Sequence, residues 1–301
     1  MNGLLKRLVH AGLGVALMTG VVGTATADFR ATRMGARPRS MGSAFVALAD
    51  DACATHWNPA GLVNEHRFQA MVTRNWMYDI ADVLQNDALT LDLPGFAVPG
   101  LGKVHTGFGF VRLGLRDIYY EDTYIISAAA DASFLQGLSL GVTGKVYRLR
   151  APGYEQWGDP SFLGDDTGYA ADLGALFDSG RGWTLGAALY NLNEPYLQLI
   201  STTVVSDPVY QAFAVGGSYL FRDTLLVTAD LRSREGGWDD TTINGGTEIW
   251  FYDALALRAG MFEGHVTMGV GFQDDRWRLD LALETHKELG DVYLLSFTLR
   301  N

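Results

Sequence analysis

The sequence predicts an all-β fold, a transmembrane antiparallel β-barrel of about fourteen strands. Apolar and polar residues alternate along most of the chain after residue 66, and an export signal precedes this region. After that signal, no apolar run reaches the roughly 18 residues that a transmembrane helix requires. The 48% hydrophobic and 19% charged residues exclude a disordered chain, and 36 glycines with 12% aromatic residues are typical of a β protein.

The N-terminus indicates a secretory signal peptide over residues 1–27. Lys6 and Arg7 form its basic region, a mostly apolar stretch follows, and Ala-Thr-Ala at 25–27 is a cleavage site of the A-x-A type. Cleavage removes two positive charges and changes the net charge from −11 to −13 (−11 − 2), which argues against nucleic acid as a partner. The alternative interpretation is an uncleaved N-terminal membrane anchor.

Fourteen segments after residue 66 have one apolar face and one polar or small face. In residues 276–285, for example, Trp277, Leu279 and Leu281 share one side and charged residues occupy the other. Successive side chains of a strand point to opposite sides, and segments of about ten residues suit tilted strands that cross an outer membrane. The expected strands lie at residues 67–77, 85–93, 103–113, 121–131, 137–150, 167–178, 183–191, 209–220, 223–233, 242–251, 254–262, 265–273, 276–285 and 291–300.

The connections between these strands alternate in length, as in outer-membrane barrels. With the N-terminus in the periplasm, most periplasmic turns are tight and the two longest connections, 151–166 and 192–208, lie outside. The exception is 94–102, which is predicted to be a long periplasmic turn rich in proline and glycine.

Aromatic residues favour the barrel over its alternative, a soluble β-sandwich. They gather in the lipid-facing phase at the predicted periplasmic strand ends, where rings are favoured at headgroup depth. These residues are Phe177, Trp183, Tyr219, Phe221, Phe251, Phe272 and Trp277. The inward phase carries charges of both signs, on Lys145, Asp172, Asp230, Arg232, Glu248, Arg258, Arg278, Asp280 and Glu284.

Residues 28–66 do not alternate. Apolar residues at 45, 48, 49 and 52 have helical spacing, which predicts a helix around 43–53 with Ser43 as its N-cap. Further on, Asn58 must be extended because it precedes proline, so it can cap a short turn that starts at Pro59. Gly61 is expected to end that turn with a positive φ.

The stretch at residues 33–62, RMGARPRSMGSAFVALADDACATHWNPAGL, resembles the N-terminal signature of FadL-like outer-membrane proteins, most closely the PorV/PorQ branch. The resemblance implies that residues 28–66 form a hatch inside the lumen and that residues 67–301 form the barrel. It also implies that the hatch motif comprises Asp50, Asp51, Trp57, Asn58, Pro59, Ala60 and Gly61. The chain departs from the family in being shorter and in ending Leu299-Arg300-Asn301, without a terminal aromatic residue.

A hatch needs partners on the barrel wall, and the inward charges supply candidates without favouring any one pair. Arg33, Arg37 and Arg39 are expected to pair with the carboxylates of Asp172, Asp230 or Glu248. Asp50 and Asp51 are expected to pair with Arg232, Arg258 or Arg278.

The motif is more typical of structure than of chemistry. Asp50, Asp51, Cys53 and His56 lack the paired spacing of metal ligands, so neither a metal nor a cofactor is expected. The single cysteine is expected to be a small buried thiol. Ser296 and His286 are not placed together by anything in the sequence, so no enzyme is expected.

Two functions remain open. The first is a FadL-like channel for uptake of hydrophobic small molecules, long-chain fatty acids or aromatic compounds, gated by the hatch. Its ligand-capture residues are expected in the apolar loop 192–208, namely Tyr196, Leu197, Leu199, Ile200, Val204 and Val205, unless these merely pack on loop 151–166. The second, implied by the PorV/PorQ resemblance, is a component of type IX secretion or of surface attachment of protein cargo.

Both functions place the chain in the bacterial outer membrane. The expected partners are outer-membrane lipid, a hydrophobic small-molecule ligand, the barrel-assembly machinery during biogenesis and, for the second function, secretion-system proteins.

Overall fold

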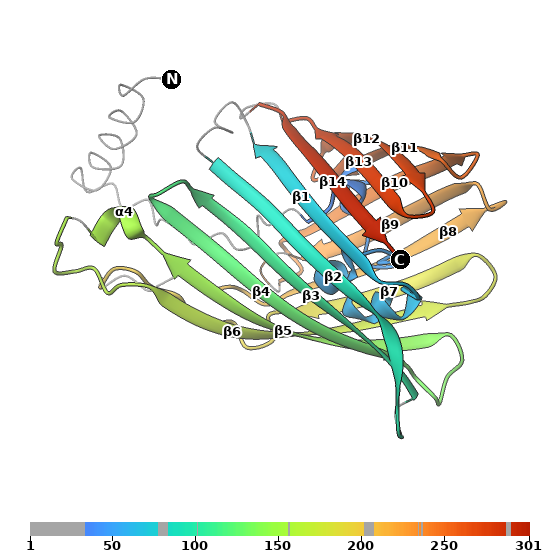
Figure 1. Ribbon diagram of the computed structural model, residues 1–301, viewed down its shortest axis with the longest axis horizontal. Coiled ribbons are helices and arrows are strands. Elements are labelled where there is room, and N and C mark those ends of the chain that lie inside the picture. The colour runs from blue at the N-terminus through green and yellow to red at the C-terminus, as the bar shows by residue number, and fades with distance from the viewer. Residues whose placement is uncertain are drawn as a thin grey trace.

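A computed structural model describes residues 34–77, 84–100, 102–155, 157–201, 208–233, 235, 237–286 and 290–301. They form a closed barrel of fourteen antiparallel strands, in which each strand pairs with its sequence neighbours and β1 closes against β14 (Figure 1). The fold class predicted from the alternating pattern is therefore confirmed. The expected signal peptide at 1–27 lies outside the described residues.

All fourteen expected strands are present. They are β1 (Gln69–Met77), β2 (Leu84–Val98), β3 (Gly102–Leu115), β4 (Tyr119–Asp131), β5 (Leu138–Arg150), β6 (Asp166–Asp178), β7 (Trp183–Tyr190), β8 (Ala212–Phe221), β9 (Leu225–Ser233), β10 (Thr241–Phe251), β11 (Leu255–Phe262), β12 (His265–Asp274), β13 (Trp277–Glu284) and β14 (Val292–Arg300). None of the helices in the described ranges has the length and apolar character that crossing a membrane requires.

The expectation of a long turn at 94–102 is wrong. Strand β2 continues through Pro94 to Val98, which pairs with Gly102 of β3. The ladder shifts register between Leu93 and Phe96, so the proline sits at an irregularity where its missing N–H breaks no regular bond. The turn is therefore short, like its neighbours at that end.

The two ends of the barrel differ in their connections. The end where β1 begins and the chain terminates, here called the terminal rim, has short turns. The opposite end, the loop rim, carries the two longest connections, after β5 and after β7, and also the short helix α4 (Pro152–Glu155). Figure 1 shows β4 to β6 reaching beyond β1 and β14 toward α4.

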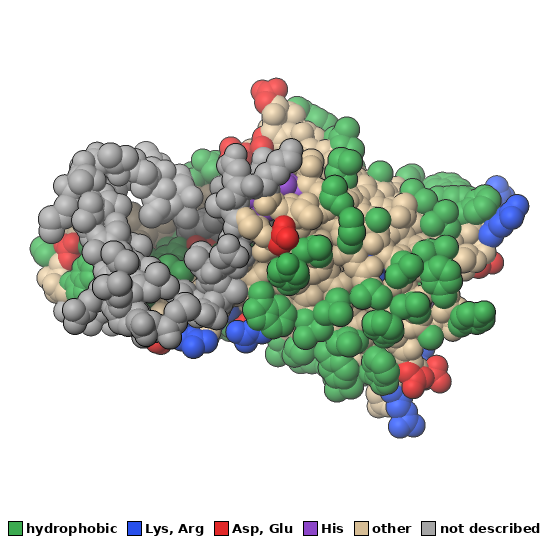
Figure 2. Space-filling model, turned by 90° about the horizontal axis from the view of Figure 1, so that it is seen from above, with side chains coloured by type: hydrophobic (Ala, Val, Ile, Leu, Met, Phe, Trp, Pro, Cys, Tyr) green, Lys and Arg blue, Asp and Glu red, His purple; other side chains and the backbone are tan. Residues whose placement is uncertain are grey.

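The outer face of the wall is apolar and the inner face is polar. In β13, Leu281 is 42% exposed whereas its neighbour Asp280 is buried. Apolar side chains cover much of the described outer surface in Figure 2. Aromatic side chains surround the terminal rim as expected, and the ring centroids of Phe177 and Trp183 lie 5.6 Å apart.

Residues 34–66, here called the lumenal segment, lie inside the barrel. The segment contains α2 (Ala36–Ser40), α3 (Ala54–Trp57) and the 3-10 helix η2 (Pro59–Asn64). Helix α2 contacts strands β11 to β14, and η2 contacts β3 to β6 on the opposite wall. Nearly every residue from 34 to 63 is buried, so the segment fills the lumen between these walls.

The helix expected around 43–53 is absent. Ser43, its expected N-cap, and Ala49 both have positive φ, at 58° and 39°, which an α-helix does not tolerate. The backbone N–H groups of Phe45 and Val46 donate to the wall carboxylate of Asp230, at 2.7 and 2.9 Å, in place of helix carbonyls. The apolar residues at 45, 48, 49 and 52, whose spacing suggested a helix, are buried because the barrel wall surrounds the segment.

Glycines of the wall make room for the segment. A Cβ at Gly141 of β5 would overlap the backbone of Pro59 and Ala60, and one at Gly174 of β6 would overlap the Asn58 side chain. Seven wall glycines have such contacts with the segment: Gly107, Gly141, Gly174, Gly186, Gly246, Gly260 and Gly269. Their backbones approach the segment closely from seven different strands, so the lumen is shaped to this one occupant.

We predict that Gly141→Ala destabilises the barrel by about 1–3 kcal/mol, because the added methyl meets backbone that has no room to shift. Gly144→Ala, three residues further along β5, is the matched control, since its Cβ would point outward and meet only Ile126 at 3.6 Å. Thermal unfolding of the two variants in detergent tests this. Equal stability of both variants would show that the segment does not rest on the wall at Gly141.

Candidate functional site

The corner Trp57–Gly61 ties the lumenal segment to the wall. Asn58 is extended (φ −163°, ψ 106°), and its side-chain oxygen accepts a hydrogen bond from the Ala60 N–H at 3.1 Å, as a cap for η2. Its Nδ2 donates to the carbonyls of Val46, at 2.8 Å, and Ala175 of β6, at 3.0 Å. One buried side chain thus joins η2, the preceding turn and the wall.

Gly61 has a different role from the one expected. It lies inside η2, without a positive φ, and η2 continues to Asn64. A Cβ at this position would overlap the backbone of Ala49. The glycine is therefore explained by close approach of two parts of the segment, and the positive φ expected from sequence is wrong.

Trp57 connects the motif to an arginine of the wall. Its indole N–H donates to the carbonyl of Met34 at 3.0 Å, and its ring meets Phe45 edge to face at 6.2 Å. The guanidinium of Arg232 lies 4.8 Å from the centre of the Trp57 ring and 5.4 Å from that of Tyr190. Arg232 contacts the motif through its aromatic residue, and not through Asp50 or Asp51 as expected.

Arg37 is the main ionic contact between segment and wall. It donates to both oxygens of Glu248 in β10, with Nε–Oε2 at 2.9 Å and Nη2–Oε1 at 2.8 Å. The same guanidinium pairs with Asp50 and, at 3.2 Å, with Asp51. The two acids of the motif therefore pair within the segment, which corrects the expectation that they meet wall arginines.

The wall arginines form a network behind this contact. Arg258 donates to Glu248 at 2.6 Å and to Asp280 at 2.8 Å, and Arg278 pairs with Asp280 at 3.1 Å. Buried charges are stabilised only when such pairing is complete. Arg258 and Arg278 thus support the carboxylate that receives Arg37.

The remaining expected partners are placed as follows. Arg39 pairs with Glu284 of β13 and lies over the ring of Phe262, 3.9 Å from its centre. Asp230 receives backbone N–H groups of the segment, whereas Asp172 pairs with Lys145 of the wall at 2.6 Å and does not meet a segment arginine. Arg33 lies outside the described residues.

The residues considered for chemistry are buried or have other partners. Burial, together with the neighbouring Asp51 charge, raises the pKa of the Cys53 thiol, so it is a poor nucleophile. Ser296 is engaged with Thr73 and the Ala36 N–H, whereas His286 stacks on His265 at 4.5 Å. Across the described ranges, no group of three or more His, Cys, Asp or Glu side chains is arranged to hold a metal ion.

The expected capture loop is folded against the barrel in part. Leu197 is buried against Tyr147 and Leu149 of β5, so its expected place in an open groove is wrong. Leu199 is partly buried in the same cluster, and Ile200 bridges to Phe162 of the neighbouring connection.

Other parts of this loop face outward or are not described. Tyr196 is 59% exposed. Val204 and Val205 lie outside the described residues. The loop therefore packs on the 151–165 connection, as in the alternative interpretation, while keeping an exposed aromatic residue.

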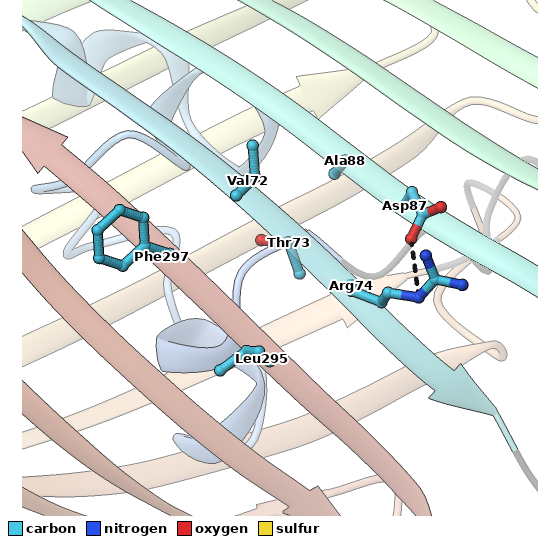
Figure 3. A pocket seen from close by; sticks show the side chains of 7 residues that line it. All are labelled: Val72, Thr73, Arg74, Asp87, Ala88, Leu295 and Phe297. Carbon is cyan, nitrogen blue, oxygen red and sulfur yellow. Dashed lines mark ion pairs between the residues drawn. The ribbon is translucent and has the colours of Figure 1, made fainter.

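A groove of about 330 Å³ lies on the outside of the wall, across β1, β2 and β14 (Figure 3). Val72, Leu295 and Phe297 supply its apolar surface, and Arg74 faces Asp87 with Nε–Oδ1 at 3.8 Å. Arg74 and Val72 are in the outward phase of β1. The groove therefore faces away from the lumen and is not part of the site.

The comparisons with known proteins agree with this architecture. No protein-family model and no curated protein matches the sequence. Among solved structures, the chain is similar to the monoaromatic hydrocarbon channel CymD, with 14% identity and a TM-score of 0.61 over 89% of this chain and 97% of that one. The toluene transporter TodX of Pseudomonas putida has 14% identity and a TM-score of 0.54, covering 88% and 96%.

A FadL homologue of Pseudomonas aeruginosa has 13% identity and a TM-score of 0.55, covering 85% of this chain and 95% of that one. At such identities the likeness shows the fold, which is FadL-like. The expected resemblance is thus confirmed for the fold, and its PorV/PorQ part stays a prediction.

We predict that Glu248→Gln loosens the lumenal segment, because it leaves Arg37 and Arg258 without their shared carboxylate, at a cost of about 3–5 kcal/mol. The readout is the alkylation rate of Cys53, which is buried and is the chain's single cysteine. The rate should rise in the variant and stay low in the control Asp178→Asn, which changes an exposed residue at the end of β6. An unchanged rate would contradict the role of Glu248.

We predict that Asn58→Ser is destabilised by about 1–3 kcal/mol. Serine is also a good N-cap, so it preserves the local bond to Ala60 while leaving the carbonyls of Val46 and Ala175 unpaired. Thermal unfolding measures the effect. Wild-type stability would mean that Asn58 serves η2 alone and does not anchor the segment to the wall.

Proposed function

We propose that the chain is an outer-membrane channel for hydrophobic small molecules, such as long-chain fatty acids or aromatic compounds, and that the lumenal segment gates it. The observation that carries the proposal is the filled lumen of a closed fourteen-stranded barrel. A solute that passes along the lumen requires the lumenal segment to move.

The outer wall supports the location. Its exposed apolar side chains and the aromatic residues at the terminal rim suit a hydrocarbon layer with a headgroup boundary. The terminal rim then faces the periplasm and the loop rim faces outward.

The contacts of the segment suit a gate. Arg37, Arg39 and the N–H groups of Phe45 and Val46 meet the wall through ion pairs and hydrogen bonds. Water can replace such bonds when the lumen opens, at a small net cost per bond. The fold shared with CymD and TodX, which are a hydrocarbon channel and a toluene transporter, supports the class of solute.

The loop rim supplies an apolar surface where a solute would first bind. Tyr196, Trp157 and Leu163 are exposed there. The rings of Tyr154 and Trp157 lie 5.5 Å apart, and the Leu163 N–H donates to the Leu199 carbonyl at 2.8 Å, which joins the two long connections. The sequence did not single out Trp157 and Leu163, because they lie in the 151–165 connection, where glycine, proline and acidic residues separate the apolar ones.

The second candidate is the PorV/PorQ-type role in secretion or surface attachment, which the motifs Asp50-Asp51-Ala52 and Trp57–Gly61 favour. It predicts that protein cargo binds at the loop rim and that the lumenal segment stays in place. The experiment below separates the two functions because it tests the movement of the segment.

We predict that a disulfide between Thr55→Cys and Gly107→Cys, in a Cys53→Ala background, abolishes uptake of toluene or oleate into liposomes. A Cβ at Gly107 would overlap the Thr55 methyl, which Thr55→Cys removes, so the two cysteines would bridge α3 and β3 at short range. Reduction of the disulfide should restore uptake, which excludes a folding defect. Equal uptake by the oxidised and reduced forms would contradict a moving gate.

A further inference from the structure

A polar cavity of about 360 Å³ lies at the terminal rim, between the lumenal segment and five strands of the wall. Its lining comprises Arg37, Asp50, Asn64, Glu65, His66, Arg67, Gln69, Trp250, Gln273, Arg278 and Arg300. These residues come from the segment, from the linker into β1 and from the inner faces of β1, β10, β12, β13 and β14. The cavity shares Arg37, Asp50 and Arg278 with the ionic network around Glu248, and its other lining residues lie outside that network.

The strand register places four of these side chains in one patch. Arg278 lies directly opposite Gln273, and Arg300 lies directly opposite Gln69. Arg278 is also opposite Thr298, two residues before Arg300, so the two arginines are diagonal neighbours on the inner face of β13 and β14. Side chains as long as arginine at diagonal positions can both contact one small ligand group placed between them.

Positive charge exceeds negative charge in this cavity. Four guanidinium groups face two carboxyl groups, and one of these, on Asp50, is paired with Arg37. Burial, reinforced by the charges of Asp51 and Asp50, raises the pKa of Glu65 to about 8, so this carboxyl is mostly protonated at pH 7. Arg37 and Arg278 meet wall carboxylates from outside the lining, with Arg278 Nε 3.1 Å from Asp280 and its Nη2 3.7 Å from Glu248. The excess positive charge of the cavity therefore lies on Arg300 and Arg67, whose hydrogen bonds in the described residues go to neutral acceptors.

The arginines also have donors without acceptors. Among the described residues, neither Nη2 of Arg278 nor Nε of Arg300 has a hydrogen-bond partner, although both atoms are buried. Arg300 donates to the neutral amide of Gln273 at 3.2 Å, and Arg67 donates to the backbone carbonyl of Asp275 at 3.4 Å. Buried donors of this kind point to a ligand or ordered water, and guanidinium groups match the oxygens of carboxylates and phosphates.

We propose that this cavity binds a small oxyanion, a phosphate or carboxylate group, between Arg278 and Arg300, with Arg67 closing on it from the linker. The anion enters from the terminal rim, to which exposed Asn64, His66 and Arg67 open the cavity. Because Arg67 follows the lumenal segment and the other two arginines belong to the wall, the bound anion holds the base of the segment to the barrel. This site goes beyond the proposed function, since it takes a polar ligand at the opposite end from the apolar loops.

The test is thermal unfolding of the purified full-length protein in neutral detergent, titrated with sodium phosphate or sodium acetate at constant pH and ionic strength. A saturable rise in melting temperature is expected, because a ligand that binds the folded state stabilises it. Arg300→Gln should raise the half-saturating concentration by about tenfold, the effect of losing one charge-assisted pair of hydrogen bonds. Arg67→Gln, an exposed change that leaves the strands intact, should raise it as well.

The control is Arg74→Gln, an arginine on the outer face of β1 that should leave the response unchanged. A response to phosphate alone assigns a phosphate group, and a response to both salts assigns a general oxyanion site. A response that does not saturate, or one that is identical in wild type, Arg300→Gln and Arg67→Gln, would overturn the proposal. The measurement does not involve uptake, so failure here leaves the proposed channel standing.

Discussion

The carboxylate of Glu248 is the point on which the interior of this barrel depends. It receives Arg37 from the lumenal segment and Arg258 from the wall, and all three side chains are buried. Without the segment, Glu248 and Glu284 would lose their contacts to Arg37 and Arg39, and without the wall, Arg37 would have only the two acids of its own motif. Each part supplies the charge that the other lacks, so the barrel and its occupant form one structure.

Shape adds a second constraint to charge. Seven glycines of the inner wall lie where the backbone or the side chains of the segment pass, so the wall has no side chain of its own at these contacts. Such a fit specifies the position of the segment closely. The segment is held there by ion pairs and by a hydrophobic cluster that joins Phe45 and Leu62 to Val111 and Ile125 of the wall.

Much of the fold could be predicted from sequence because strand alternation is a local signal. The fourteen strands and the extended Asn58 before Pro59 follow from side-chain direction and from proline sterics. The prediction of a helix around 43–53 was wrong because the segment is buried on all sides, so the spacing of its apolar residues does not report a helical face. Hydrogen bonds from the segment backbone to Asp230 take the place of helix hydrogen bonds.

The ion pairs, and the positions where wall glycines contact the lumenal segment, could not be predicted from the sequence in the same way. Both depend on which residues face each other across the lumen, and this requires the register of the closed barrel. Glu284 and Asp280 were assigned to the inward phase, yet only the structure shows that one receives Arg39 and the other supports Arg258. Asp50 and Asp51 pair with Arg37 of the same segment, and not with the wall arginines that were expected.

The most direct test of the central claim is hydrogen–deuterium exchange of the Phe45 and Val46 amides, which are bonded to Asp230, in protein embedded in bilayers. The account predicts slow exchange in the absence of solute, and faster exchange during solute flux while the amides of the strands stay protected. Equal protection of Phe45 and Val46 with and without flux would show that the segment is a permanent part of the barrel core and would contradict a gate.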